Sequence, residues 1–182
     1  HLVSASTSSV YGANKNLPFC ESNIADHPTQ FYAATKRSNE IMAHAYSHMF
    51  KVPVTLLRFF TVYGPWGRPD MSLYMFVKNI IENKKINVFN HGNHSRDFTY
   101  IDDIVAGIIL TLKKIPSSDK NWDPRKPNPA ASSAPFKVLN IGGGKNISLM
   151  NFIKIIENLL KKKAKIKFIN FQSGDIKDTR AN

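Results

Sequence analysis

Apolar residues in this chain fall into two kinds of segment that alternate along its length. Some are short runs rich in β-branched residues, such as the run from Val52 to Phe60, and these predict buried strands. Others are longer, with apolar residues three and four positions apart, and these predict amphipathic helices. The expected strands are 1–5, 52–60, 86–90, 138–141 and 165–170, and the expected helices are 29–50, 71–83, 102–114 and 148–161. This alternation is typical of an α/β fold with a largely parallel sheet.

Polar segments rich in Pro, Gly, Ser and Asn separate these elements, and no internal repeat is visible. The expected loops are a Ser/Thr-rich segment after the first strand, a polar connection over 12–28, turn chemistry over 63–70 and a long Pro-rich loop over 116–135. The expected helix starts are Pro28 and Thr29 in a first turn, Asp102 or a neighbour as a cap, and Ser148 as a cap.

The composition is that of a folded globular chain. The 182 residues are 42% hydrophobic, with a mean hydropathy of −0.27, which excludes general disorder and a fibrous repeat. No apolar run approaches the roughly 18 residues of a membrane span, and no signal-peptide pattern opens the chain. The single cysteine, Cys20, cannot form an internal disulfide, so a cytoplasmic location is expected. Because His1 leads directly into a strand, we expect a piece of a longer protein.

The formal net charge of +12 allows an anionic partner but does not identify one. Most of the lysines are scattered singly. The one dense run is Lys161, Lys162, Lys163, Lys165 and Lys167. It follows the C-terminal end of an expected helix, where cations offset the helix dipole, so a solvated face is the simplest interpretation. No zinc-finger spacing or RNA-binding aromatic motif accompanies it, and we expect neither a nucleic-acid nor a membrane partner.

The strongest candidate for chemistry is Tyr32-Ala-Ala-Thr-Lys36, in the helix expected over 29–50. At 100° per residue, Tyr32 and Lys36 share a face with Asn39 and Ala43. The main apolar arc lies on another side and is expected to face the core: Phe31, Ala34, Ile41, Met42, Ala45 and Met49. An ammonium one turn from a phenol stabilises the phenolate, which can then act as a base. The alternative is a surface Tyr–Lys pair packed one turn apart.

Three further motifs give this pair a context. Ser4-Ala-Ser-Thr-Ser-Ser-Val-Tyr-Gly12 puts hydroxyls at the end of a strand, where ligands bind in open α/β sheets. Arg58-Phe-Phe-Thr-Val-Tyr-Gly-Pro65 and Asn90-His-Gly-Asn-His-Ser-Arg-Asp-Phe-Thr-Tyr-Ile-Asp-Asp103 follow it. In this order the motifs resemble the extended short-chain dehydrogenase/reductase family, in its sugar-nucleotide epimerase and dehydratase branch, over essentially the whole chain. The resemblance implies NAD as cofactor, a UDP-sugar as substrate, and a Rossmann-like doubly wound parallel sheet with a smaller substrate-binding lobe.

The chain departs from the family pattern at its front. Family members carry a Gly-rich dinucleotide fingerprint in their first βαβ unit, and these 182 residues contain none. Gly142-Gly-Gly-Lys145 fits neither G-x-G-x-x-G nor the P-loop pattern, so we interpret it as a tight strand-to-helix turn. The resemblance places 1–62 and 101–145 in the C-terminal part of the Rossmann-like domain, and 63–100 and 146–182 in the two parts of the substrate-binding lobe.

The triplet before Val-Tyr-Gly separates the chemistries of the family. Dehydratases have Thr-Asp-Glu there and the related decarboxylases commonly have Glu last, whereas this chain has Thr7-Ser8-Ser9. Elimination of water needs a group that protonates the leaving hydroxyl, and this triplet holds no carboxylate. The resemblance therefore implies epimerisation at C4, in which hydride passes from C4 to tightly bound NAD, leaves a 4-keto sugar, and returns to the opposite face.

The resemblance also implies roles for individual residues near the reacting carbon. Tyr32 is the base that takes the 4-hydroxyl proton, and Thr7 hydrogen-bonds the same oxygen. Lys36 binds the nicotinamide ribose and keeps Tyr32 ionised. Ser8 and Ser9 belong to the substrate-binding residues. Both Tyr32 and Lys36 are thus expected to contact the cofactor as well as to serve catalysis.

Two more positions are expected at the ends of the bound molecules. Phe60 matches the residue that lies against the nicotinamide region. Arg96, in the Arg-Asp-Phe motif, matches the arginine that grips the nucleotide diphosphate, a use that suits a guanidinium fork. The alternative for Arg96 is a surface ion pair with Asp97 or Asp103.

Thr61 and Arg68 bear on the type of sugar. Epimerases of neutral hexoses usually have Asn at the position of Thr61, and Arg68 lies in the run from Tyr63 to Asp70, which looks like that of UDP-glucuronate 4-epimerases. A hydroxyl and a guanidinium could bind the C6 carboxylate of such a substrate directly. The alternative for Arg68 is a loop ion pair with Asp70.

Other hypotheses stay open. Among enzymes, the alternative is a 4-epimerase of a neutral or N-acetylated UDP-hexose; outside that class, the chain is a catalytically silent remnant or a basic binding module. We expect the 182 residues alone to be inactive and the full protein to be a two-fold dimer that pairs through helix 29–50 and a neighbour. His44 and His48 lack the zincin glutamate between them, and no His signal accompanies Cys20, so neither a metal site nor a nucleophilic cysteine is expected.

Overall fold

Three strands pair into a parallel sheet at the centre of the molecule. The computed structural model describes residues 1–172 and 174–182. In it, β1 (Leu2–Thr7), β2 (Val54–Phe59) and β6 (Phe136–Ile141) lie in the order β1-β2-β6, and both pairings are parallel. The carboxyl ends of the three strands therefore meet at one edge of the sheet.

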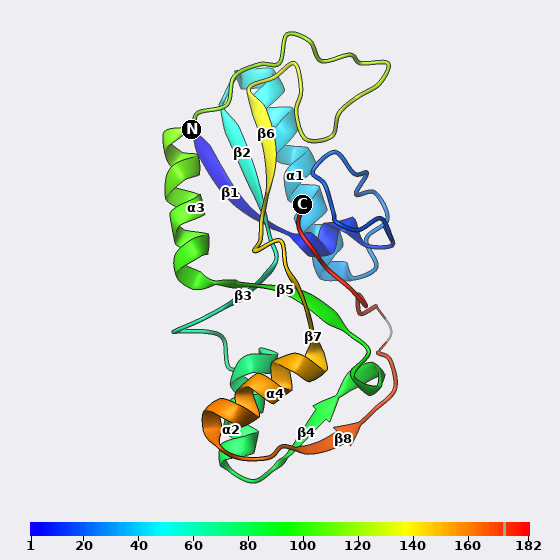
Figure 1. Ribbon diagram of the computed structural model, residues 1–182. Helices are drawn as coiled ribbons and strands as arrows, with labels where there is room; N and C mark the ends of the chain where they lie inside the picture. The colour runs from blue at the N-terminus through cyan, green and yellow to red at the C-terminus, as the bar shows by residue number, and fades with distance from the viewer. Residues whose placement is uncertain (173) are drawn as a thin grey trace.

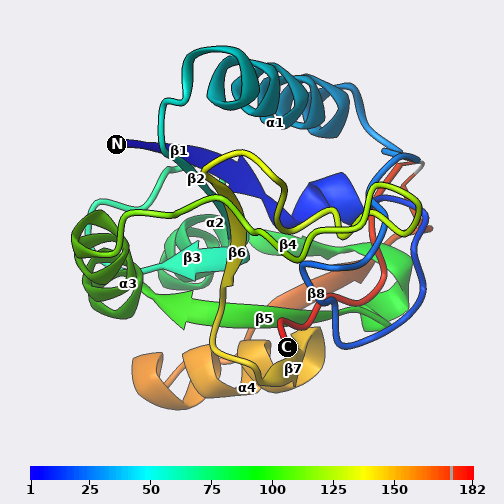
Figure 2. The ribbon, with the colours of Figure 1, turned by 90° about the horizontal axis from the view of Figure 1, so that it is seen from above.

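Helices α1 (Phe31–Phe50) and α3 (Ile101–Lys113) lie on opposite sides of this sheet, as Figures 1 and 2 show. We call β1, β2, β6, α1 and α3 together the sheet lobe. The buried apolar residues of one of its clusters are Val54, Leu56, Ala134, Phe136 and Val138. They come from β2, from β6 and from the end of the Pro-rich loop, so this loop helps to close the core.

A second group of elements, the small lobe, lies beyond the carboxyl edge of the sheet, at the bottom of Figure 1. It contains α2 (Ser72–Ile81), α4 (Leu149–Leu160) and a parallel pair, β4 (Lys85–Val88) with β8 (Lys165–Phe168). Its buried apolar core consists of Phe76, Ile80, Ile86, Val88, Phe152, Ile153 and Ile156. The small lobe therefore has a hydrophobic core of its own.

Short elements join the two lobes. β3 (Thr61–Tyr63), β5 (Ser95–Tyr100) and β7 (Asn146–Ser148) pair in the order β3-β5-β7, and two short 3₁₀ helices, η1 (Ser8–Tyr11) and η2 (Phe89–Gly92), complete the fold. The α/β class with parallel strands expected from the sequence is confirmed. The sequence did not predict β3, β5 or β7.

Helix α1 begins at Phe31, and the start expected at Pro28 and Thr29 is wrong. Gln30 is its N-cap residue and makes no side-chain capping bond within the described chain. The side chains of Thr29 and Gln30 instead both donate to the carbonyl oxygen of Gly174. The segment before the helix is thus held by a distant part of the chain, and not by local capping.

The starts of the other two helices divide in the same way. Tyr100 precedes α3, and its side chain makes no capping bond among the described residues, so the cap expected from Asp102 or a neighbour is wrong. Asp102 lies in the first turn of α3, where a carboxylate stabilises the helix dipole. Ser148 caps α4 as expected, because its hydroxyl oxygen accepts the N–H of Asn151.

Helix α1 turns a different face to the sheet from the one that its apolar arc predicts. Its buried residues are Ala33, Glu40 and Ser47. Several members of the expected core arc are exposed instead: Phe31, Ile41, Met42 and Met49. The small side chains at Ala33 and Ser47 let the helix approach the sheet closely, and Glu40 is paired there with a strand residue. The expectation that the apolar arc faces the core is therefore wrong.

A buried carboxylate fastens the turn after β6 to β5. Asp97 accepts the backbone N–H groups of Gly143 at 2.7 Å, Gly144 at 2.9 Å and Ala181 at 3.0 Å. A Cβ atom at Gly142 would lie 2.7 Å from the Cβ of Ala181, so the close approach requires glycine there. The glycine run is a structural turn, as the sequence predicted.

We expect Asp97→Asn to lower the free energy of unfolding by about 2–3 kcal/mol, because an amide group would face backbone N–H donors with a donor of its own. Chemical denaturation of the purified protein measures this change. The matched control is Asp123→Asn, at an exposed carboxylate in the Pro-rich loop, which should leave the denaturation midpoint unchanged. Equal midpoints for the two variants would contradict the anchoring role of Asp97.

Candidate active site

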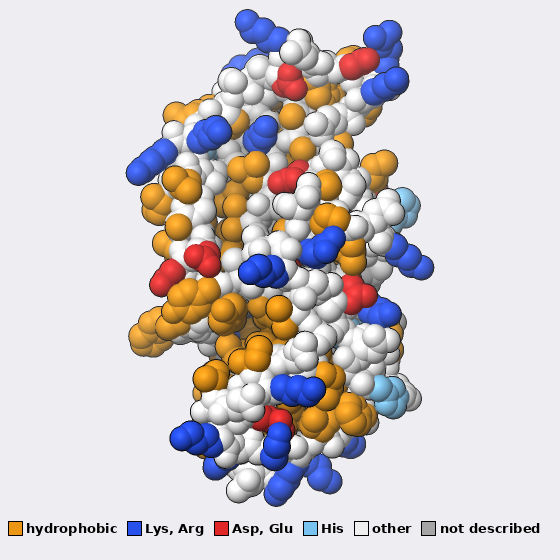
Figure 3. Space-filling view, in the orientation of Figure 1, with side chains coloured by type: hydrophobic (Ala, Val, Ile, Leu, Met, Phe, Trp, Pro, Cys, Tyr) orange, Lys and Arg blue, Asp and Glu red, His pale blue; other side chains and the backbone are white. Residues whose placement is uncertain are grey.

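A cavity of about 1260 Å³ opens between the two lobes, at the carboxyl ends of β1 and β2. Residues of both lobes and of the connecting segments line it, including Ala5–Ser9, Tyr32, Lys36, Phe59–Arg68 and several residues of α2. Figure 3 shows hydrophobic side chains gathered at the waist between the lobes, on the side where the 64–71 segment projects. In open α/β sheets this edge is where ligands bind, and the volume suits a ligand larger than a typical drug-sized molecule.

The end of β1 brings three hydroxyl groups to the cavity. Thr7, Ser8 and Ser9 all line it. The Thr7 hydroxyl oxygen accepts the Ser9 N–H at 3.2 Å and so caps η1, and the same hydroxyl donates to the Ser9 Oγ at 3.2 Å. Each of the three is largely buried in its own protein. The turn into η1 therefore fixes the hydroxyls at the floor of the cavity.

Helix α1 presents Tyr32 and Lys36 to the same cavity. Tyr32 is 53% exposed, so its phenol is open to solvent and to a ligand. The Lys36 ammonium donates to the carbonyl oxygen of Ala5 at 3.2 Å. This contact ties the helix to the last turnward residues of β1, two positions before Thr7. The structure thus brings together the three residues for which the sequence predicted catalysis.

The segment after β2 supplies the opposite wall. Phe60 is buried and Thr61 opens β3, and both line the cavity. Arg68 also lines it, but its guanidinium forms a two-pronged ion pair with Asp70, with the Nε–Oδ1 contact at 3.0 Å. The hydrogen bonds of this pair raise the pKa of Arg68 and lower that of Asp70. Both interpretations of Arg68 therefore describe part of its surroundings.

Arg96 does not line the main cavity. Its guanidinium donates to the carboxylate of Asp175 at 2.9 Å and to the carbonyl oxygens of Ser95 and Lys177 at 3.0 and 2.8 Å. The partner is thus Asp175, and neither of the aspartates considered from the sequence. Burial lowers the pKa of Arg96, against the opposing effect of Asp175. A role for Arg96 in binding a diphosphate stays a prediction.

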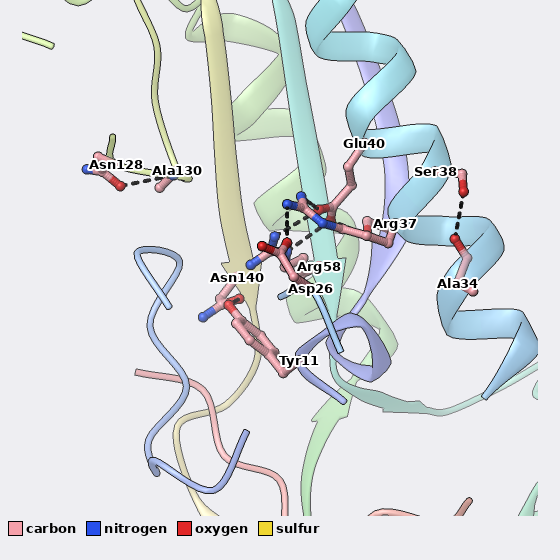
Figure 4. A network of polar contacts seen from close by, with 11 residues as sticks. Tyr11, Asp26, Ala34, Arg37, Ser38, Glu40, Arg58, Asn128, Ala130 and Asn140 are labelled. Atoms are coloured by element: carbon pink, nitrogen blue, oxygen red, sulfur yellow. Dashed lines mark hydrogen bonds and ion pairs between the residues drawn. The ribbon is translucent and has the colours of Figure 1, made fainter. Parts of the chain in front are cut away.

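Behind the catalytic candidates lies a buried ion pair that the sequence did not reveal. Glu40 of α1 and Arg58 of β2 are 1% and 0% exposed. The Arg58 Nε and Nη2 atoms donate to the two oxygens of Glu40 at 2.9 and 2.8 Å (Figure 4). Ser6 of β1 donates to the same carboxylate at 2.6 Å, and Arg37 at 2.9 Å. Burial alone would raise the pKa of Glu40, but Arg58, Ser6 and Arg37 together hold it below its ordinary value.

The network continues across the sheet. The Arg58 guanidinium lies 4.8 Å from the centre of the Tyr11 ring, and the Tyr11 hydroxyl donates to the Asn140 side chain of β6 at 2.7 Å (Figure 4). Burial raises the pKa of Tyr11, so the phenol is neutral and donates this bond. The sequence carried one usable signal for the network, the position of Glu40 one turn after Lys36.

The other features singled out in the sequence have ordinary surroundings. His44 contacts the Ser132 hydroxyl at 2.8 Å, and burial lowers the pKa of His44. Within residues 1–172 and 174–182, no group of three or more His, Cys, Asp or Glu side chains is placed to hold a metal ion. Of the lysine run, Lys162 donates to the carbonyl oxygen of Ile81 and Lys163 pairs with Glu157. In the part of the chain that the structure describes, no helix is long and apolar enough to cross a membrane.

Comparison with known proteins identifies relatives along the whole chain. The model of the NAD dependent epimerase/dehydratase family matches residues 1–123. The chain is 53% identical over 182 residues to Protein CapI of Staphylococcus aureus, covering all of this chain and 54% of that protein. It is 48% identical over 183 residues to a probable UDP-glucuronate 4-epimerase of Rhizobium meliloti (strain 1021), again covering all of this chain and 54% of that protein.

A solved structure is similar to the fold described above. It is the crystal structure of UDP-glucuronic acid 4-epimerase from Bacillus cereus in complex with UDP-glucuronic acid and NAD. The TM-score is 0.83 at 35% identity, and the match covers 99% of this chain and 52% of that one. The likeness confirms the Rossmann-like α/β fold. The chain spans about half the length of the curated relatives that it matches.

Proposed function

The chain belongs to the NAD dependent epimerase/dehydratase family, and from this premise we propose that the full protein is an NAD-dependent 4-epimerase that interconverts UDP-glucuronate and UDP-galacturonate. The observation that carries the proposal is a single cavity lined both by a base with its helper groups, Thr7, Tyr32 and Lys36, and by Thr61 and Arg68, which suit a carboxylate. The relatives with UDP-glucuronate 4-epimerase in their names support the choice of sugar.

The chain's own residues divide the work at C4 of the sugar. Tyr32, one turn from the Lys36 ammonium, accepts the proton of the 4-hydroxyl and later returns it. Thr7, held at the cavity floor by its bonds to Ser9, donates a hydrogen bond to the same oxygen. The triplet Thr7-Ser8-Ser9 offers no carboxylic acid to protonate a leaving hydroxyl, which favours epimerisation over elimination of water.

The cavity fits the nicotinamide end of NAD. Phe60 offers a buried aromatic ring at its wall, and Tyr32 and Lys36 offer the hydroxyl and ammonium donors that a ribose needs. When bound, NAD supplies the acceptor and donor of hydride. The pyrophosphate needs a Gly-rich turn at a helix N-terminus, and the 182 residues contain no such fingerprint. We therefore assign residues 1–62 and 101–145 to the cofactor domain and 63–100 and 146–182 to the substrate-binding lobe.

Substrate charge is assigned to the wall that follows β2. Thr61 and Arg68 lie on the same side of the cavity as Phe60, and a C6 carboxylate there competes with Asp70 for the Arg68 guanidinium. Holding that carboxylate also has a chemical purpose, because the 4-keto sugar is a β-keto acid that loses CO2 readily. We assign Ser8 and Ser9 to the sugar and Arg96 to the nucleotide diphosphate, which must displace Asp175 to reach the guanidinium.

Arg68→Ala should reduce kcat/KM for UDP-glucuronate roughly tenfold to a hundredfold, because it removes a charge-assisted contact to the carboxylate. Turnover of UDP-glucose should change much less. The test uses a completed chain, in which the N-terminal half of a relative that carries the Gly-rich fingerprint precedes residues 1–182. Steady-state assays with both sugars measure the split, and a UDP-pentose by-product should increase in the variant.

Two matched variants interpret that result. Arg68→Lys keeps the charge without the fork and should give an intermediate loss. Tyr32→Phe should abolish turnover of every sugar while NAD still binds. Equal losses for charged and neutral sugars in Arg68→Ala would make Arg68 structural, as its pairing with Asp70 suggests, and would favour a 4-epimerase of a neutral or N-acetylated UDP-hexose.

Residues 1–182 alone should not bind NAD tightly and should not epimerise any UDP-sugar, since these residues give the pyrophosphate no Gly-rich turn. Equilibrium binding of NAD to the purified 182-residue chain, with the completed chain as control, measures this directly. Stoichiometric, tight binding together with turnover by the 182 residues would refute the expectation.

We also propose that the completed protein forms a two-fold dimer through α1 and α3. Both helices leave large apolar side chains on the surface: Phe31, Ile41, Met42, Tyr46, Met49 and Phe50 on α1, and Val105, Ile109, Leu110 and Leu112 on α3. An isologous contact between such helices closes on itself. Light scattering at micromolar concentration should give a dimer that Met42→Glu disrupts, whereas Leu159→Glu on the exposed face of α4 should not. A monomeric unmodified protein would contradict this assembly.

A further inference from the structure

We propose that Glu40 is a positioning residue, which holds helix α1 at the place on the sheet where Tyr32 and Lys36 share a cavity with Thr7. The inference rests on the proposed function, because it explains how the base and the hydroxyl of that reaction keep their relative places. Glu40 does not line the main cavity. Any effect of Glu40 on the reaction must therefore pass through the residues that do.

The first observation is the spacing along α1. Tyr32, Lys36 and Glu40 are four residues apart and lie on successive turns of one helix face. Exposure falls along this face, from 53% at Tyr32 to 1% at Glu40. The face that carries the base therefore enters the protein at Glu40, which is its only fully buried member.

The second observation is that this face contacts consecutive residues of β1. Lys36 donates to the carbonyl oxygen of Ala5 at 3.2 Å, and Glu40 accepts the hydroxyl of Ser6 at 2.6 Å. Thr7 is the next residue of the strand and lies at the cavity floor. A shift of α1 along or away from β1 would break these bonds and change the place of Tyr32 relative to Thr7.

The third observation is that the carboxylate of Glu40 is held from four directions. One oxygen accepts the Ser6 hydroxyl and the Arg58 Nε, and the other accepts the Arg58 Nη2 and the Arg37 Nη1. The donors come from β1, from β2 and from α1 itself. A forked contact of this kind fixes orientation as well as distance. Glu40 thus ties the helix to both strands whose ends form the cavity floor.

Stability alone gives little reason for such a pair. The cost of taking both charges out of water offsets most of their attraction, and apolar side chains of similar volume often replace a buried pair without loss. Geometry at the reacting atoms is more demanding, because a misplacement of about 1 Å can reduce a rate a hundredfold. The specific consequence of the Glu40–Arg58 pair is therefore expected in the rate, and only secondarily in the melting temperature.

The test is the double variant Glu40→Leu with Arg58→Met in the completed chain, which removes both charges and leaves no unpaired one. We expect a melting temperature close to that of the unmodified protein, a kcat for UDP-glucuronate reduced roughly tenfold to a hundredfold, and a nearly unchanged KM. The matched control is Leu56→Ala, a buried residue of the same strand. It should lower the melting temperature through a cavity while kcat stays close to normal.

Single substitutions add a graded comparison. Glu40→Gln keeps the shape and some of the acceptors, so its kcat should lie between those of the unmodified protein and the double variant. Should it fail to fold with Arg58 unpaired, the double variant still decides. A normal kcat in the double variant would overturn the proposal, and so would a loss of kcat in Leu56→Ala that matches its loss of stability.

Failure of the proposed function is distinguishable from failure of this inference. If the unmodified completed chain turns over no UDP-sugar, the proposed function is wrong, and the crystal structure of the double variant then tests the placement. A displaced α1, with the Lys36 ammonium beyond hydrogen-bond distance of the Ala5 carbonyl oxygen, supports positioning by Glu40. An α1 that keeps its place and that bond contradicts it.

Discussion

The ion pair between Glu40 and Arg58 is the contact on which the arrangement of the site depends. It joins α1 to β2 where neither side chain reaches solvent, and the Ser6 hydroxyl adds β1 to the same carboxylate. A buried charge that lost its partner would be strongly unfavourable, so the pair forms or is replaced as a unit. The elements that carry Thr7 and Tyr32 consequently have one relative position, and the parallel strands deliver their ends to it.

The small lobe completes a site that the sheet lobe begins. The sheet lobe places hydroxyls, a phenol and an ammonium at the edge of its strands, whereas the wall formed by Thr61, Arg68 and the residues of α2 belongs to the segments beyond that edge. Asp97 joins the two parts by binding the turn after β6 and the backbone of Ala181. Under the proposed function, reaction chemistry lies on the first side of the cavity and selection of the sugar on the second.

Periodicity in the sequence predicted the helices and the longer strands well, because those elements bury apolar residues. It failed where polar residues are buried. In β5 the buried positions include Asp97 and Thr99, and Asp97 is satisfied by Gly143, 46 residues away, which no local window contains. On α1, Glu40 would ordinarily be solvated, and its burial depends on Arg58, 18 residues further along. The same mismatch explains why the apolar arc of α1 is exposed.

Motif recognition predicted the site better than periodicity predicted its supports. Thr7, Tyr32, Lys36, Phe60, Thr61 and Arg68 all line the one cavity, although they come from four separate segments. Their order along the chain carries this information because the strand ends and the helix face are set by the fold. Arg96 differs, because its guanidinium is held by Asp175, a contact that depends on the fold of the C-terminal segment.

The central claim is that the site oxidises and reduces one carbon of the sugar, with Tyr32 moving only the hydroxyl proton. UDP-glucuronate carrying deuterium at C4, incubated with the completed chain in ordinary water, tests this most directly, with the product examined by NMR and mass spectrometry. The account predicts UDP-galacturonate that keeps its deuterium at C4, because the hydrogen removed from that carbon returns to it. Product in which solvent hydrogen has replaced the deuterium at C4 would contradict the account.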